Sequence, residues 1–339
     1  MSPALLEVRD LHVHFPTEDG LVKAVDGVSL TVDKGETLGV VGESGSGKSV
    51  TFMTVMGLIN RKSAQVSGEV LFDGVNLLAI PDKLLRRIRG ERIGMVFQDP
   101  MTSLHPMLRV GDQIAEAVLA HRDVKKDVAG KMAVDALRRV GIPAPEQRAR
   151  QYPYEFSGGM RQRAMIAMGI VLEPELLIAD EPTTALDVTV QAQILELVAE
   201  LKERLGIGVV LISHNLGVIA DVAQRVMIMY AGRPVEIASR DAFFDQPRHP
   251  YSWGLLESIP RPDVRVERLT PIPGAPPSLI HVPPGCPFHP RCPHRFAPCD
   301  TDRPDLVGEG GHLDACHLPM EDKVRLWAER RARLEDAAA

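Results

Sequence analysis

The sequence predicts an α/β protein in which a phosphate-binding loop joins a buried strand of a parallel sheet to a helix. Three observations lead to this class. Residues 42–49 (GESGSGKS) fit the P-loop pattern G-x-x-x-x-G-K-[ST]. The apolar runs at 176–180 and 209–213 have the length and composition of buried strands. Residues 107–172 read mostly as helices. The predicted architecture therefore adds an antiparallel β layer, an inserted helical subdomain and a small, irregular, cysteine-rich C-terminal extension to the P-loop core.

The first stretch of the chain, residues 5–41, alternates apolar and polar side chains and is rich in β-branched residues. This pattern predicts strands of an antiparallel layer ahead of the loop. Phe15 lies in this layer and is a candidate to stack on an adenine ring. The alternative is a simple core position, which is the commoner role of an aromatic residue in a strand.

The P-loop has the flanks that its chemistry requires, because residues 37–41 read as a buried strand and residues 49–59 as a helix. Glycines let successive backbone N–H groups turn inward, and a helix N-terminus adds positive potential, so polyphosphate binds there. Lys48 is expected to reach the β- and γ-phosphates, and the Ser49 hydroxyl to bind Mg²⁺. The alternative is a Gly/Ser-rich surface turn. The residues expected to contact ATP in this loop are Gly42, Ser44, Gly45, Gly47, Lys48 and Ser49.

The middle of the chain supplies two more candidate positions. Residues 93–97 read as an apolar strand that ends at Gln98. The helical subdomain, about residues 100–174, contains residues 156–160 (FSGGM) directly before a helix. Ser-Gly-Gly at a helix N-terminus is a second candidate phosphate site, and the alternative is an N-cap and nothing more.

A buried strand over residues 176–181 ends in two carboxylates, Asp180 and Glu181. In P-loop enzymes an acid at this strand end holds Mg²⁺, and a second acid beside it can polarise the attacking water. Solvated turn acids are the alternative, but the apolar run and the P-loop favour the functional interpretation. The next apolar run is followed by His214. Gln98, the acid pair and His214 are therefore expected at the P-loop edge of a parallel sheet, where ligands bind in open α/β folds.

The end of the chain differs in composition from the rest. Residues 225–237 predict a hairpin, and a domain boundary is expected near residue 240. The predicted domains are residues 1–240, which carry the motifs above, and residues 241–339. The second is Pro-dense from 260 to 304 and finishes in a charged helix.

Composition limits the classes of function. Of the 339 residues, 45% are hydrophobic and 25% are charged, as in soluble globular proteins, and the formal net charge is −6. This balance, with no basic block, argues against a nucleic-acid-binding protein. No apolar run reaches the ~18 residues that a membrane-spanning helix needs, and the N-terminus lacks the regions of a signal peptide. We expect a cytosolic chain that sits on a membrane only by binding other subunits.

The four cysteines, Cys286, Cys292, Cys299 and Cys316, are clustered near the end of the chain. Clustering in a cytosolic chain points to metal ligation rather than disulfides. The gaps between them are wider than the paired spacing of structural zinc sites and also miss the common ferredoxin spacing. Four thiolates suit Zn²⁺ or a [4Fe–4S] cluster, and unligated buried cysteines remain a third possibility. Nearby histidines keep a mixed site open: His289, His294, His312 and His317.

Together, these motifs resemble those of the nucleotide-binding subunits of ABC transporters, in the same order, over residues 5 to about 240. Gln98 matches the glutamine of the Q-loop, residues 156–160 match the ABC signature, and residues 185–187, which include Asp187, match the D-loop. The resemblance implies that Gln98 binds or senses Mg²⁺ and links the site to transmembrane subunits.

The same resemblance assigns the remaining chemistry. Asp180 matches the Mg²⁺ ligand, Glu181 the catalytic glutamate that polarises water, and His214 the switch histidine that contacts the γ-phosphate. With Lys48, these residues form the expected catalytic set. ATP, with Mg²⁺, is the implied cofactor.

The chain has one P-loop and one signature, whereas in ABC ATPases two such domains face each other head-to-tail. The resemblance therefore implies a second ABC ATPase subunit, a paralogue or a second copy of this chain, whose γ-phosphate is contacted by Ser157, Gly158 and Gly159 of this chain. It also implies two transmembrane permease subunits, an extracytoplasmic substrate-binding protein in the same complex, no nucleic acid, and a place at the cytoplasmic face of the membrane.

A narrower resemblance is to the ATPase subunits of dipeptide, oligopeptide and nickel importers. It rests on residues 98–104 (QDPMTSL), 156–163 (FSGGMRQR), 249–251 (HPY) and the tail at 285–292 (GCPFHPRC). Such tails carry an iron–sulfur cluster, so the resemblance favours [4Fe–4S] over Zn²⁺ for the four cysteines. It implies an ATPase that powers peptide import by ATP-driven closure of the dimer.

Three other functions compete with peptide import. One is an importer ATPase for nickel or another small solute, which the sequence hardly separates from peptide import because this subunit does not contact cargo. Another is a soluble ABC protein of translation or DNA repair, against which the single ATPase domain, the acidic balance and the lack of heptads argue. The third is a degenerate regulatory subunit, against which the intact Glu181 and His214 argue.

Overall fold

The computed structural model describes residues 4–184, 186–258 and 271–336. These residues divide into two compact units. The first unit consists of Thr31–Thr37, Val70–Ile212 and the described residues before Val8. The second unit consists of Val8–Leu30, Leu38–Glu69 and the described residues from Ser213 onward.

The second unit holds most of the N-terminal strands and the described residues of the C-terminal part of the chain. Its elements are β1 (Leu6–Thr17), β2 (Gly20–Val32), β3 (Thr37–Val41), α1 (Lys48–Val55), β4 (Gln65–Phe72), α9 (Leu216–Val222), β9 (Arg225–Tyr230), β10 (Arg233–Ser239), α10 (Arg240–Asp245), α11 (Pro250–Glu257), the 3₁₀ turn η2 (His289–Arg291), β11 (Val307–Glu309), β12 (His312–Asp314) and α12 (Met320–Asp336). Strands β2, β1 and β4 neighbour one another in that order within one sheet, where the sequence predicts the antiparallel layer.

Strand β3 of the second unit leads into the P-loop. All five of its residues are buried, as expected for the run TLGVV. It pairs in parallel with β9, with Val41 opposite Ile228. Strand β9 turns back antiparallel into β10. The parallel pair fixes the place where β3 ends and the loop begins.

Two strands that the sequence did not predict continue this sheet. Strands β11 and β12 form a short hairpin, and β12 pairs antiparallel with β10, with Glu236 opposite Asp314. Each is only three residues long, too short to show an alternating pattern in a Pro-dense segment. The extension is therefore irregular only in part, and strands on both sides of residue 240 are hydrogen-bonded. The predicted domain boundary there stays a prediction.

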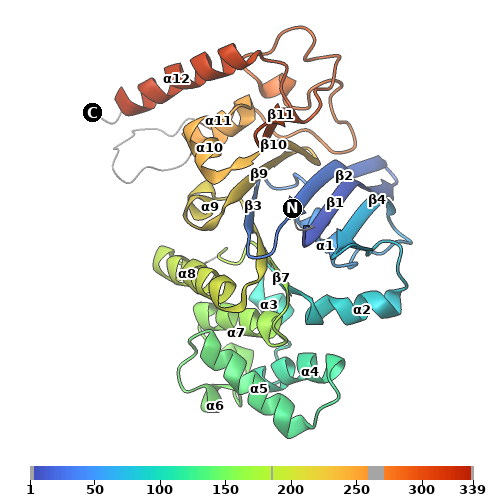
Figure 1. The fold of residues 1–339 in the computed structure, drawn as a ribbon, viewed down its shortest axis with the longest axis vertical. Coiled ribbons are helices and arrows are strands. Elements are labelled where there is room, and N and C mark those ends of the chain that lie inside the picture. The colour runs from blue at the N-terminus through green and yellow to red at the C-terminus, as the bar shows by residue number, and fades with distance from the viewer. Residues whose placement is uncertain (1–3, 185, 259–270, 337–339) are drawn as a thin grey trace. The chain divides into compact units, whose positions relative to one another are not determined.

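The first unit combines three parallel strands with a group of helices. Its elements are β5 (Val75–Asn76), α2 (Asp82–Glu91), β6 (Ile93–Val96), α3 (Pro100–Ser103), α4 (Val110–His121), α5 (Lys126–Arg139), α6 (Pro145–Arg148), η1 (Pro153–Glu155), α7 (Gly158–Ile170), β7 (Leu176–Asp180), α8 (Val188–Leu205) and β8 (Gly208–Ser213). Strands β6, β7 and β8 are parallel neighbours and are fully buried. Helices α4, α5, α6 and α7 gather together in Figure 1, where they form the helical part of this unit.

Side-chain caps fix where three functional helices begin. Ser157 caps α7 by accepting from the Met160 N–H, Asp187 caps α8 by accepting from the Val190 N–H, and Asn215 caps α9. Among the described residues, no helix has the length and apolar character needed to cross a membrane. The predicted α/β class, with its antiparallel layer and helical insertion, is confirmed. The bounds of about 100–174 for the helical subdomain stay a prediction.

Candidate nucleotide-binding site

Lys48 is the first residue of α1 and closes the P-loop. Its side chain is buried, and Nζ donates to the Gly42 carbonyl oxygen at 2.8 Å and to the Glu43 carbonyl oxygen at 3.0 Å. The loop thus wraps around a primary ammonium group. A lysine ammonium beside a helix N-terminus is a point charge that suits phosphate binding.

The glycines of this loop are required by geometry. Gly47, directly before α1, has φ +95°, and Gly45 has φ +76°, both in the left-handed region that favours glycine. A Cβ atom on Gly42 would lie 2.2 Å from the Met229 carbonyl oxygen, and one on Gly47 would lie 2.3 Å from the Ala24 carbonyl oxygen. Ser44 and Gly45 are exposed, whereas Gly42, Gly47 and Lys48 are buried and Ser49 is half-buried. A glycine-lined loop with an enclosed lysine at a helix N-terminus fits a polyphosphate group.

The carboxylate pair follows β7 in the first unit. Asp180 is the last residue of β7 and is buried, and Glu181 comes next with φ +47°. The Glu181 carboxylate accepts a hydrogen bond from Gln98 Nε2 at 2.9 Å and another from the Thr184 hydroxyl at 2.9 Å. The structure therefore brings together Gln98 and Glu181, two residues that the sequence predicts for one site. A non-glycine residue in the left-handed region is uncommon and is typical of functional turns.

The signature residues lie at the start of α7, also in the first unit. Ser157 and Gly158 are exposed, and Gly159 is half-buried, where a Cβ atom would lie 2.8 Å from Val190 Cγ1 on α8. Asp187 at the start of α8 is exposed. The exposed serine and glycine leave this helix start open to another molecule.

His214 and Phe15 belong to the second unit. His214 follows β8 and is exposed, and Phe15 lies on β1 and is half-buried. The sequence-predicted residues are thus distributed between the two units, with the P-loop, Phe15 and His214 in one and Gln98, the acid pair, the signature and Asp187 in the other.

The four cysteines line one pocket in the second unit. They share it with aromatic, apolar and imidazole side chains, and the full lining is His249, Pro250, Cys286, Phe288, His289, Cys292, His294, Cys299, Cys316, His317 and Leu318. None of the four forms a disulfide. Burial raises the pKa of the Cys292 thiol to about 11 and that of Cys316 to about 12, and it also raises the pKa of Cys286.

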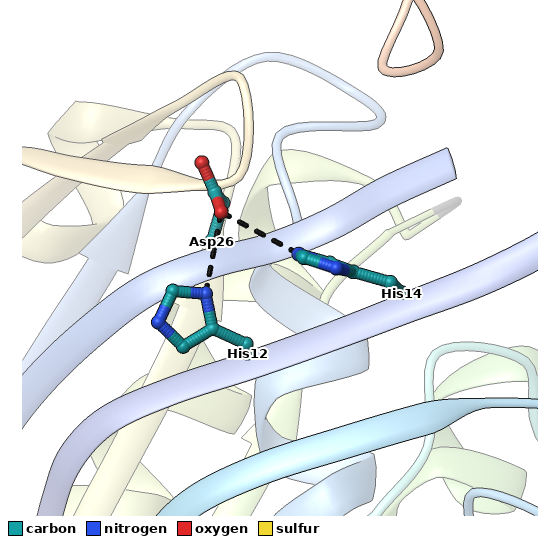
Figure 2. Close-up of side chains that lie close together, drawn as sticks. All are labelled: His12, His14 and Asp26. Carbon is teal, nitrogen blue, oxygen red and sulfur yellow. Dashed lines mark hydrogen bonds and ion pairs between the residues drawn. The ribbon is translucent and has the colours of Figure 1, made fainter. Parts of the chain in front are cut away.

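A second group of possible metal ligands lies on β1 and β2, and sequence reasoning missed it. Figure 2 shows His12 and His14 directed toward one oxygen of Asp26, at 3.2 Å from His12 Nδ1 and 3.4 Å from His14 Nε2. The other carboxylate oxygen of Asp26 is held by Arg233 at 3.0 Å and Arg303 at 3.2 Å. Burial alone raises the pKa of Asp26, but Arg233 and Arg303 lower it to about 2. The carboxylate charge is compensated by guanidinium groups, so this cluster is an ion-pair network of the β layer.

One contact of the P-loop was also missed. The Glu43 carboxylate pairs with Arg291 of η2, at 2.7 Å between Oε2 and Nη1. The two residues are far apart in the sequence, and no local pattern predicts such a contact.

Two family models match this chain, one in its N-terminal part and one in its C-terminal part. Residues 25–184 match the family model described as ABC transporter, and residues 235–299 match the one described as oligopeptide/dipeptide transporter, C-terminal region. The chain is 54% identical over 316 residues to the dipeptide transport ATP-binding protein DppD of Bacillus subtilis, covering 93% of this chain and 94% of that protein. It is 49% identical to the oligopeptide transport ATP-binding protein OppD of Salmonella typhimurium, covering 94% and 95%.

Solved structures agree in fold. The dimeric structure of MJ0796, a bacterial ABC transporter cassette, is 26% identical with a TM-score of 0.62 and covers 69% of this chain and 98% of that one. The structure of cbiO1 from Clostridium perfringens, part of the cbiONQ ABC transporter complex, is 28% identical with a TM-score of 0.61 and covers 72% and 91%. The ABC cassette fold expected from the motifs is confirmed.

These comparisons contradict the expectation that the four cysteines bind a [4Fe–4S] cluster, and that expectation is wrong. The matching model for the C-terminal region and the relatives are described by peptide transport and ATP binding, with no iron–sulfur group. Burial favours the protonated form of the Cys292 and Cys316 thiols. Among the described residues, the one set of three or more ligand atoms within 4.8 Å is that of His12, His14 and Asp26. The cysteines therefore do not form a compact tetrahedral zinc set either.

Proposed function

Because this chain belongs to the family of ATP-binding subunits of dipeptide and oligopeptide ABC transporters, we propose that it hydrolyses ATP to power peptide import across a membrane. The observation that carries the proposal is the P-loop, in which a buried Lys48 and the glycines Gly42 and Gly47 form a cradle for polyphosphate. The similarity to peptide-transport relatives over more than nine-tenths of the chain supports the choice of cargo class.

For the chemistry, we propose that Lys48 holds the β- and γ-phosphates while Ser49, Gln98 and Asp180 hold Mg²⁺. When bound, the metal neutralises charge on the phosphate oxygens. Glu181 orients and polarises the attacking water. Its hydrogen bonds from Gln98 and Thr184, both accepted by Oε2, support this role because they orient the carboxylate.

We propose further that Phe15 stacks on the adenine ring and that His214 contacts the γ-phosphate. Ser157, Gly158 and Gly159 then act on the γ-phosphate bound by a second ATPase subunit. The exposure of Ser157 and Gly158 at the N-terminus of α7 supports this assignment, because free N–H groups at a helix start bind anions. Asp187 would contribute to the same dimer contact.

The proposed partners are two transmembrane permease subunits, a second and paralogous ATPase subunit, and an extracytoplasmic substrate-binding protein. The chain would then lie at the cytoplasmic face of the membrane as a peripheral subunit. Support comes from the relatives, which are named as ATP-binding proteins of transport systems, and from the solved cassette described as dimeric. Affinity purification from detergent-solubilised membranes, followed by mass spectrometry, should recover the permeases and the second ATPase. Recovery with ribosomes or DNA alone would contradict the transport assignment.

The catalytic proposal is tested with Glu181→Gln in the assembled transporter reconstituted in liposomes. Loss of the charge that polarises water should lower the rate of ATP hydrolysis about a hundredfold or more. ATP binding should persist, because the P-loop is unchanged, and the closed dimer should accumulate. The matched control is Glu173→Gln, which removes an exposed ion pair with Arg139 of the same unit and should hydrolyse ATP at the wild-type rate. Near-normal turnover in Glu181→Gln would remove Glu181 from its proposed role.

A further inference from the structure

The C-terminal extension holds the P-loop through a two-point ion pair. Both terminal guanidinium nitrogens of Arg291 donate to the Glu43 carboxylate, Nη1 to Oε2 at 2.7 Å and Nη2 to Oε1 at 3.0 Å. Glu43 is the residue after the first P-loop glycine, and Arg291 lies in η2, directly before Cys292. Both residues are in the second unit. This parallel arrangement fixes the direction as well as the distance of the two groups.

Arg291 is itself held rigidly. Its side chain is 6% exposed, and Nε donates to the Pro273 carbonyl oxygen at 2.9 Å. The guanidinium carbon lies 5.8 Å from the centre of the Tyr230 ring and 5.9 Å from that of Phe288. Tyr230 and Phe288 pack edge to face, with ring centres 5.3 Å apart. Because these contacts hold Arg291 in place, the position of the extension determines where its guanidinium group binds the Glu43 carboxylate.

Glu43 is also held through its main chain. Its N–H donates to the Tyr251 hydroxyl oxygen at 3.0 Å, and its carbonyl oxygen accepts from Lys48 Nζ at 3.0 Å. Tyr251 packs on Tyr230 and Phe288, with ring centres 4.6 Å and 5.4 Å away. Three groups of Glu43 are therefore fixed. Arg291 and Tyr251, which both follow β10, hold its carboxylate and its N–H group, and Lys48 holds its carbonyl oxygen.

We propose that Arg291 is a positioning residue for ATP binding, which sets the conformation of the P-loop by fixing Glu43. The inference rests on the proposed function and deepens it, because it makes the extension part of the nucleotide site. A phosphate-binding loop binds through the direction of its backbone N–H groups, so a loop fixed in advance loses less entropy on binding. The network runs from Arg291 through Glu43 to Lys48, the residue proposed to hold the β- and γ-phosphates.

The inference predicts a graded series in the dissociation constant for Mg·ATP, measured by calorimetry with the full-length chain. Arg291→Met, which removes the ion pair, should weaken binding about tenfold, and Arg291→Lys, which keeps one charged contact, should recover part of that loss. Glu43→Gln should weaken binding in the same direction. In the double variant Glu43→Gln/Arg291→Met the two effects should not add, because both substitutions remove one interaction.

The matched control is Arg330→Met. Arg330 also forms a part-buried ion pair in the second unit, with Glu257 at 2.6 Å, and lies 5.5 Å from the centre of the Trp253 ring, but its partner is outside the P-loop. Melting temperatures show whether each variant is folded. Wild-type affinity in Arg291→Met, or an equal loss in Arg330→Met, would overturn the inference while leaving the ATPase proposal intact. A wild-type chain that fails to bind Mg·ATP would overturn the proposed function and this inference together.

Discussion

At the scale of single residues, His249 shows how burial fixes a protonation state. Its side chain is 1% exposed, and Nδ1 caps α11 by accepting from the Tyr251 N–H at 3.0 Å. Burial, together with the charge of Lys323, lowers the pKa of His249 to about 3. The imidazole is therefore neutral near pH 7. Acceptance by Nδ1 places its remaining proton on Nε2.

This shift predicts a loss of stability in mild acid. The pKa of His249 is lower in the folded chain than the ~6.5 of an unperturbed histidine, so the unfolded chain binds more protons below that pH. Its contribution to the free energy of unfolding is fully present above pH 6.5 and should fall by about 2 kcal/mol at pH 5. Asn caps a helix without titrating, so in His249→Asn this part of the pH dependence should vanish. Urea denaturation from pH 7 to 5 measures both slopes, and parallel curves would refute the assignment.

At the scale of elements, the P-loop is shaped by close backbone approach as much as by its lysine. The Gly42 position faces the carbonyl oxygen of Met229 at the end of β9, and the Ser46 hydroxyl oxygen is only 2.7 Å from where a Cβ atom would be. Strands β3 and β9 are parallel neighbours, which brings this carbonyl to the loop. The loop conformation therefore depends on the register of two strands that are distant in sequence.

This packing predicts that two Gly→Ala substitutions differ sharply. Gly42→Ala has no room for its methyl group and should lower the free energy of unfolding by about 3 kcal/mol or more, with a matching loss of ATP binding. Gly35→Ala is the control, because Gly35 has φ +74° but nothing within 4 Å of its added Cβ. It should cost only the strain of a left-handed alanine, about 1 kcal/mol. Equal melting temperatures for the two variants would show that the loop can yield around Met229.

The elements that could be predicted from the sequence are those whose signals are local. The P-loop, the two acids after β7 and the helix start at Ser157 each show residue type, spacing and flanking pattern within a few positions. The contacts that could not be predicted from the sequence are long-range. The Arg291–Glu43 pair joins two segments with no shared pattern, and β12 is three residues long. Such pairings depend on the completed fold and leave no periodicity in the chain.

At the scale of the whole molecule, hydrogen bonds and ion pairs of buried charged residues hold the C-terminal extension within the second unit. Glu236 on β10 is fully buried, and its carboxylate accepts from the Arg248 and His249 N–H groups and lies 2.8 Å from His312 Nε2. On β12, Asp314 pairs with Lys323 of α12 at 2.6 Å. Breaking a buried pair leaves an uncompensated charge, so these contacts strongly favour the extension remaining in place.

A chain ended after residue 240 tests whether the predicted N-terminal domain folds alone. We expect it to be insoluble or aggregated, because β10 would lose β12 and present an unpaired edge. The control ends after residue 336 and keeps all the described elements; it should be soluble and bind ATP. The soluble fraction and size-exclusion profile of each chain are the measurements. A soluble, ATP-binding chain of residues 1–240 would show that the boundary near 240 separates independent domains.

The pairing of β10 with β12 also has a consequence for the timing of biosynthesis. A ribosome releases the chain from its N-terminus, so the P-loop, the signature and the acid pair all emerge before the partner of β10 exists. The edge of strand β10 stays unpaired until the residues of β12, which include Asp314, have been synthesised. During that interval the nascent subunit carries every motif for nucleotide chemistry but lacks Arg291, the side chain that holds Glu43. We therefore expect the full affinity for ATP to arise only late in translation, once the extension is in place.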